Sequence, residues 1–294
     1  MATTEATAPA TTAPSEPVER RRDRRRVNVP GGLGSLLWLA VVIVPVYWVL
    51  VTSLRTQQHF FVDHPLGLPT APTLDNYRQV VDSGFDRYLL NSVVVTVGAV
   101  ALTIAVALLA AYTITRNTSR FVSRSFSVFL LGLAIPLQAA IVPIFYMITK
   151  MGLYDTLLAL VLPTAAFAVP ITVIILVNFL RDIPRELFES MRVDGAGEWQ
   201  VLVRLVLPLS RPAIATVAIY DGLNAWNGFL FPLVLTQSPD QRVLPLALWA
   251  FQGELTINVP AVMAAVVLSA LPIFLLYLIG RRQLVAGLTA GFGK

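Results

Sequence analysis

The sequence contains no cysteine and only two histidines among its 294 residues. The lack of cysteine excludes a disulfide framework and a thiolate metal site. Neither histidine lies in a long apolar run, and no G-x-S-x-G nucleophile motif occurs. The C-terminal Gly291-Phe-Gly-Lys294 lacks the spacing and the following serine or threonine of a phosphate-binding loop. We therefore expect no catalytic site, no metal site and no bound cofactor in this chain, which is typical of a protein that is not an enzyme.

Charged residues are also scarce. They make up 13% of the chain, against about 25% in soluble domains, whereas hydrophobic residues reach 56%. Six apolar segments have the roughly 20-residue length that a helix needs to cross a bilayer. They lie near residues 34–54, 88–115, 125–149, 157–180, 213–236 and 259–280. The predicted fold class is therefore an all-α membrane protein with six transmembrane helices, several of them kinked by internal prolines.

The N-terminal region differs in composition from the rest. Residues 1–29 are rich in alanine, threonine and proline and then in arginine, so they have too little apolar surface to form a core, and we expect a disordered tail. The first apolar run, Leu33 to Leu54, is too long for the core of a signal peptide and is predicted to be an anchor. Residues 30–294 are then expected to form one membrane domain.

Lysine and arginine are distributed unevenly between the predicted loops. With the N-terminus inside, 17 of the 22 basic residues lie in cytoplasmic segments. The exceptions are Arg55, Arg78, Arg87, Lys150 and Arg242. This asymmetry predicts a multi-pass protein of the inner or plasma membrane, with both termini and residues 181–212 in the cytoplasm. It also explains the formal net charge of +5 without a nucleic-acid partner.

Residues 181–212 form a charged island between two apolar segments. Apolar residues fall at helical spacing on both sides of Asp194-Gly195. They are Leu187, Phe188 and Met191 before it, and Trp199, Leu202, Val203 and Val206 after it. The pattern predicts two amphipathic helices joined at a glycine turn on the membrane surface. Such a paired element is suited to filling a groove on another protein.

The same segment carries a family resemblance. Glu189-Ser190-Met191, Asp194-Gly195-Ala196 and Leu207-Pro208 resemble the EAA loop of ABC-importer permeases, with Ser190 and Met191 in place of two alanines. Three further segments are similar to the sugar-importer branch of these permeases, the MalG-like subunits. They are Ile135–Pro143, Ala225–Leu235 and Gly287–Gly291. The resemblance extends from about residue 34 to the C-terminus.

The resemblance implies a function and a set of partners. The chain would be a transmembrane permease subunit of an ATP-driven, binding-protein-dependent importer in a bacterial or archaeal cell membrane, and would form the pathway for a sugar or oligosaccharide. Its partners would be a second, MalF-like permease, two subunits that bind ATP and Mg, and an extracytoplasmic solute-binding protein. The residues implied in coupling to the ATPase are Glu189, Met191, Asp194, Gly195 and Ala196.

Two alternatives remain open at this point. The solute of such a permease need not be a sugar, since the external binding protein usually sets specificity in the family. The other alternative is an ATP-independent secondary carrier. Against it stand a single intramembrane carboxylate and the lack of a clear internal repeat, because carriers commonly show charged midplane sites and repeats.

A few polar residues interrupt the predicted spans. Burial of a carboxylate in a bilayer is costly, so Asp221 is predicted to face the bundle interior or a water-filled pathway. Asn224 and Asn227 follow it at helical spacing, and Trp226 could supply an apolar platform for a sugar ring. The alternative role for these residues is interhelical hydrogen bonding that fixes packing. The remaining candidates for the pathway are Gln138 and Tyr146.

The two longest predicted external loops have different interpretations. In residues 55–87, His59, Asp63 and His64 belong to residue types that ligate metals. The prolines and glycine that follow them favour a turn-rich loop without a metal. The loop 237–258 is the better candidate for contact with an external protein.

Overall fold

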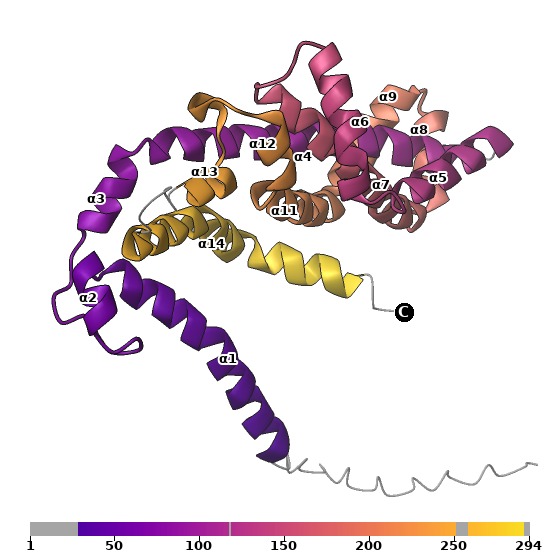
Figure 1. Cartoon of the computed structure of the whole chain (residues 1–294). Helices are drawn as coiled ribbons and strands as arrows, with labels where there is room; N and C mark the ends of the chain where they lie inside the picture. The colour runs from indigo at the N-terminus through magenta and orange to yellow at the C-terminus, as the bar shows by residue number, and fades with distance from the viewer. Residues whose placement is uncertain (1–28, 118, 251–257, 291–294) are drawn as a thin grey trace, which may run out of the picture. The chain divides into compact units, whose positions relative to one another are not determined.

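The structure, a computed structural model, describes residues 29–117, 119–250 and 258–290 (Figure 1). Every regular element in these residues is a helix, as predicted for the fold class. The chain divides into two compact units, one that ends at Pro45 and one that begins at Val46. Residues 1–28 of the predicted tail lie outside the described residues, and Val29 already begins the first helix.

The helices are numbered along the chain as in Figure 1. The first eight are α1 (Val29–Ser53), α2 (Gln57–Val62), α3 (Asp75–Asp82), α4 (Phe85–Arg116), α5 (Arg120–Gly132), α6 (Leu137–Lys150), α7 (Leu158–Arg181) and α8 (Arg185–Val193). The others are α9 (Glu198–Val201), the π-helical turn η1 (Leu202–Val206), α10 (Leu207–Leu209), α11 (Arg211–Trp226), α12 (Leu230–Leu235), the 3₁₀ turn η2 (Pro239–Gln241), α13 (Leu244–Ala250) and α14 (Val259–Ala290).

Within the described residues, three helices are individually long and apolar enough to cross a membrane, namely α1, α4 and α7. They coincide with the predicted segments 34–54, 88–115 and 157–180. Two bent pairs, α5 with α6 and the segment Glu198–Leu209 with α11, raise the number to five if each pair is one span. The apolar part of α14, Val259–Leu275, is shorter. Six spans therefore stay a prediction.

Two of the predicted spans are broken in the structure. Segment 125–149 bends by 105° between α5 and α6, and Pro136 immediately precedes the first turn of α6. Proline restricts the residue before it to extended backbone, which disfavours a helix through Ile135. Segment 213–236 stops being helical at Trp226, where Asn227 caps α11, and restarts at Leu230. The structure thus has breaks in two of the segments for which the sequence predicted kinked spans.

The core of the second unit forms where α4 meets α7 and α11. Gly98 of α4 lies so close to α7 that a Cβ at this position would be 3.3 Å from a methyl group of Val161. Further along α4, Ala107 and Ala111 are fully buried. Close approach at small residues is the usual basis of helix packing in membranes, because apolar side chains gain little by leaving lipid. Small residues on α4 therefore set the spacing of the two spans.

The outward surfaces of the spans are apolar. Val94 and Val97 on α4 and Leu271 and Leu275 on α14 are large hydrophobic side chains that lie exposed. Soluble monomers rarely expose contiguous apolar patches of this kind, so lipid or another membrane subunit is the expected surrounding. The chain is a multi-pass membrane protein.

Candidate coupling element and solute pathway

A glycine turn joins α8 to α9. The backbone of Gly195 has a φ of +80°. The N–H of Ala196 donates to the carbonyl of Met191 at 2.9 Å, and the N–H of Gly195 donates to the carbonyl of Arg192 at 3.0 Å. These two bonds form a Schellman motif, the helix ending in which a glycine takes the left-handed conformation. The sequence therefore fixes the angle between α8 and α9 locally, and we call residues 185–201 the α8–α9 element.

The inner face of the α8–α9 element and of η1 packs against the chain's own spans. Phe188 is 3% exposed, and the guanidinium of Arg116 at the end of α4 lies 4.1 Å from the centre of its ring, a cation–π contact. Met191 and Ala196 are partly buried in the same cluster, which includes residues of α4 and α7. Phe188, Met191 and Ala196 thus attach the element to the chain's own helices α4 and α7.

The outer face of the element is partly polar and partly apolar. Glu189 and Asp194 are exposed. Two large apolar side chains also lie on the surface, Val193 at 86% and Trp199 at 69% exposure. Sequence spacing grouped Trp199 with the inner residues, but it lies two residues before the buried Val201, about 200° away around a helix. Two exposed apolar side chains and two exposed carboxylates of the element are thus available to a partner.

A polar network joins the α8–α9 element to α4. The carboxylate of Glu198 accepts a hydrogen bond from the hydroxyl of Tyr112 on α4 and another, at 2.6 Å, from the guanidinium of Arg192 on α8. The bond from Tyr112, followed by that from Arg192, holds the pKa of Glu198 below its usual value. Glu198 is therefore charged at neutral pH and connects three helices at one point.

A cavity of about 280 Å³ lies between α7 and α11. Asp221, which is 3% exposed, lies in its lining. The carboxylate Oδ2 of Asp221 accepts a hydrogen bond from Thr172 Oγ1 at 2.8 Å, whereas Oδ1 has no hydrogen-bond partner among the described residues. Asn224, Tyr220 and Phe167 also line the cavity. A carboxylate, an amide and two aromatic rings can together bind the hydroxyls and the apolar face of a sugar.

Trp226 and Asn227 lie away from this cavity. Trp226 is buried in a cluster with Phe85 and Leu244, and it does not line the cavity of Asp221. Asn227 donates to the carbonyl of Leu223 at 2.8 Å and lines, with Trp226, a separate apolar cavity of about 610 Å³ between α11, α13 and α14. Six residues of helix place Asn227 about 120° from Asp221, and Asn227 does not line the cavity of Asp221.

Gln138 and Tyr146 are exposed on α6 and do not line the cavity of Asp221. Leu137 does line it, and the next residue of a helix points about 100° away. The ring of Tyr146 lies 5.5 Å from the ammonium group of Lys150. The structure thus brings Asp221 and Asn224 together and leaves the other four candidates apart from them.

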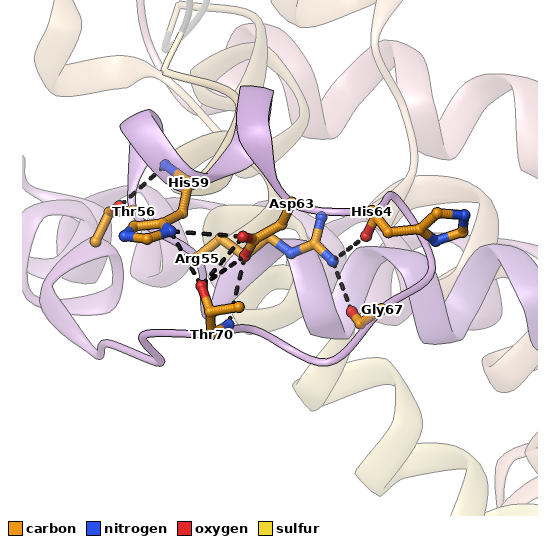
Figure 2. Close-up of polar contacts among 7 residues, drawn as sticks. All are labelled: Arg55, Thr56, His59, Asp63, His64, Gly67 and Thr70. Carbon is orange, nitrogen blue, oxygen red and sulfur yellow. Dashed lines mark hydrogen bonds and ion pairs between the residues drawn. The ribbon is translucent and has the colours of Figure 1, made fainter.

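Polar contacts also close the loop that follows α1 (Figure 2). Arg55 is 1% exposed, and its Nη2 donates to the carbonyls of His64 and Gly67 at 2.7 and 2.6 Å. His59 and Asp63 share a threonine hydroxyl, while the ring of His64 points away from both in Figure 2. No group of three or more histidine and acidic side chains in the described part of the chain could hold a metal ion. The contacts are those of a folded loop.

Residues 88–289 match the family model described as binding-protein-dependent transport system inner membrane component. The chain is 34% identical over 272 residues to the diacetylchitobiose uptake system permease protein NgcG of Streptomyces coelicolor, which covers 92% of this chain and 89% of that one. It is 32% identical over 265 residues to the trehalose/maltose transport system permease protein MalG of Thermococcus litoralis, covering 88% and 94%.

Among solved structures, a chain of a bacterial ABC transporter involved in the import of the acidic polysaccharide alginate has the same fold. Its TM-score is 0.77 at 21% identity, over 91% of this chain and 99% of that one. Residues 88–289, which match the family model, include the α8–α9 element and the cavity of Asp221. The chain therefore belongs to the family of binding-protein-dependent transport system inner membrane components.

Proposed function

We propose that this chain is the permease subunit of an ATP-driven ABC importer and forms part of the pathway for a sugar or oligosaccharide. The observation that carries the proposal is the α8–α9 element. Its inner face is packed on α4 and α7, whereas Val193, Trp199, Glu189 and Asp194 are exposed. An element that is fixed on the spans and carries an exposed apolar pair is suited to receive movement from a docked protein.

The docked protein in this proposal is an ATP-binding subunit. Two such subunits bind ATP and Mg in the cytoplasm, which is also the side that the distribution of basic residues favours for the α8–α9 element. Glu189, Asp194 and Gly195 contact the ATP-binding subunit, whereas Met191 and Ala196 hold the element on the spans. A second, MalF-like permease supplies the other half of the pathway, and an external solute-binding protein delivers the solute. Nucleotide-driven closure then moves the element together with α4 and α7.

The solute pathway in this proposal includes the cavity of Asp221. Asp221 is in the lining of the cavity, and its buried Oδ1, which has no hydrogen-bond partner among the described residues, is the acceptor that we propose for a sugar hydroxyl. The rings of Phe167 and Tyr220 supply the apolar contact. No lysine or arginine is among the described residues that line the cavity, so an uncharged sugar is favoured over an anionic one. The two relatives are named for the uptake of diacetylchitobiose and of trehalose and maltose, which supports a sugar as the solute.

Purification of the chain with its bound partners, followed by reconstitution into vesicles, tests the proposal. We expect mass spectrometry to identify an ATP-binding subunit, a second permease and a solute-binding protein, and uptake to require ATP hydrolysis. A solute-binding protein that carries a non-sugar solute would overturn the sugar assignment alone. Uptake driven by an ion gradient, with no ATP-binding subunit in the eluate, would overturn the whole proposal in favour of a secondary carrier.

A further inference from the structure

One end of α4 is hydrogen-bonded to the loop between α12 and α13. The side-chain amide of Asn91 donates to the carbonyls of Asp240 and Arg242 at 2.8 and 2.9 Å. The hydroxyl of Ser92 accepts a hydrogen bond at 2.8 Å from the first backbone N–H of α13. Asn91 and Ser92 are 7% and 3% exposed, and Arg87, one turn earlier, pairs with the carboxylate of Asp240. The loop cannot move relative to α4 without breaking buried hydrogen bonds.

The other end of α4 contacts the α8–α9 element through a hydrogen bond and a cation–π contact. Tyr112 donates to Glu198, and the guanidinium of Arg116 lies over the ring of Phe188. Asn91 and Tyr112 are 21 residues apart on one helix, which corresponds to about 32 Å. A bilayer has a hydrocarbon core of about 30 Å. The two sets of contacts are therefore separated by the thickness of a membrane.

α4 itself is suited to carry displacement between these ends. It is helical for 32 residues and has no internal proline, whereas α1, α7 and α14 each contain at least one. Sharp kinks arise mostly at proline, so α4 lacks a usual cause of kinks that the other three helices contain. Its extensive packing on α7 restrains it further.

We propose that α4 is a rigid connection between the loop Pro239–Leu244 and the α8–α9 element. Asn91 and Ser92 are its positioning residues at one end, and Tyr112 and Glu198 at the other. The inference rests on the proposed function, in which a solute-binding protein contacts the external side and an ATP-binding subunit contacts the α8–α9 element. Stimulation of ATP hydrolysis by the loaded solute-binding protein then passes through α4. Because linkage between two binding sites is reciprocal, nucleotide binding also changes the affinity for the solute-binding protein by the same factor.

The experiment compares ATP hydrolysis by the reconstituted complex with and without loaded solute-binding protein. Tyr112→Phe removes only a hydroxyl, and Asn91→Ala removes the outer hydrogen bonds. Each is expected to lower the stimulation about fivefold or more, the lower end of usual coupling factors. The stimulation in the double variant is expected to equal that of the single variant with the lower stimulation. The reason is that a connection released at one end transmits no displacement, so release of the other end has no further effect. Ser92→Ala, which also removes only a hydroxyl, replaces Asn91→Ala if that variant does not assemble.

A matched control lies in the middle of the same helix. Thr103 is fully buried and donates only a long hydrogen bond, of 3.4 Å, to the carbonyl of Ala165. Thr103→Val removes a hydroxyl from α4 without touching either end, and full stimulation is expected. Three outcomes would each overturn the inference: undiminished stimulation in Tyr112→Phe, losses that multiply in the double variant, or an equal loss in Thr103→Val. The proposed function would still hold in each case if the unmodified complex shows ATP-driven uptake. An unmodified complex without ATP-driven uptake would overturn the proposed function itself.

Discussion

Gly195 determines the angle of the α8–α9 element, and its replacement has a calculable cost. A Cβ added there would meet no heavy atom within 4 Å, so Gly195→Ala costs only the penalty of the left-handed conformation, about 1–2 kcal/mol. Since 1.4 kcal/mol is a factor of ten, the native turn becomes roughly ten times less populated relative to open forms. Gly195→Pro is more severe, because proline fixes φ near −65° and removes the N–H that bonds to Arg192.

The chain offers a matched control two residues further on. Gly197 has a φ of −73° and open space around a Cβ, and it caps the start of α9. Gly197→Ser is therefore expected to be neutral or slightly stabilising, since serine is a favoured helix cap. Gly195→Asn is expected to be milder than Gly195→Ala, because asparagine tolerates the left-handed region.

Two measurements test whether the left-handed conformation of Gly195 determines the angle of the α8–α9 element. Hydrogen exchange of the α8 amides is expected to speed up about tenfold in Gly195→Ala, and ATP-coupled uptake is expected to be lost in Gly195→Pro while the variant still inserts and binds the second permease. Unchanged exchange and uptake in Gly195→Pro would refute the reasoning. An equal loss in Gly197→Ser would show that the left-handed conformation is not the cause.

Three further predictions concern other parts of the site. Val193→Asp is expected to abolish binding of the ATP-binding subunit without lowering the thermal stability of the permease, because the side chain is 86% exposed. Met191→Asp puts a charge against the chain's own core and is expected to lower both the binding and the thermal stability. A stability loss in Val193→Asp and none in Met191→Asp would contradict the assignment. Asp221→Asn keeps an acceptor for Thr172 but removes the charge, so assembly is retained and the uptake rate falls about fivefold, or about 1 kcal/mol; normal uptake would assign Asp221 to packing. The pKa of Glu198 is lower in the folded chain than in the unfolded chain. Its hydrogen-bond network is therefore expected to be intact above the unfolded-state pKa and to be lost as the pH falls through the folded-state pKa, which hydrogen exchange would detect as a loss of protection in α9. Loss of that protection on raising the pH would contradict this prediction.

The helical fold and the α8–α9 turn could be predicted because both depend on local sequence. The length of an apolar run is enough to place α1, α4 and α7, and a glycine after an amphipathic run is enough to place a helix end. Which face of a span meets protein was harder to predict. Both faces are apolar in a membrane, so periodicity carries little signal, and it could not show that Asp221 and Trp226 line different cavities.

Polar contacts between distant segments were beyond sequence reasoning for a different reason. Tyr112 and Glu198 are 86 residues apart, and Thr172 and Asp221 are 49 apart. Each partner is an ordinary residue for its local setting, so only the tertiary fold, which brings α4 to α9 and α7 to α11, joins them. Asp221 itself could be predicted because a carboxylate in an apolar run is costly and therefore unusual.

The most direct measurement asks what the outer face of the α8–α9 element touches. The chain has no cysteine, so a cysteine introduced at Val193 or at Ser238 is a unique crosslinking site. Both variants are treated with a thiol-directed crosslinker in membranes that contain the assembled complex, and the products are identified by mass. We predict an adduct between position 193 and an ATP-binding subunit, and none between position 238 and that subunit. An ATP-binding subunit crosslinked to position 238 and not to position 193 would contradict both the orientation and the docking site.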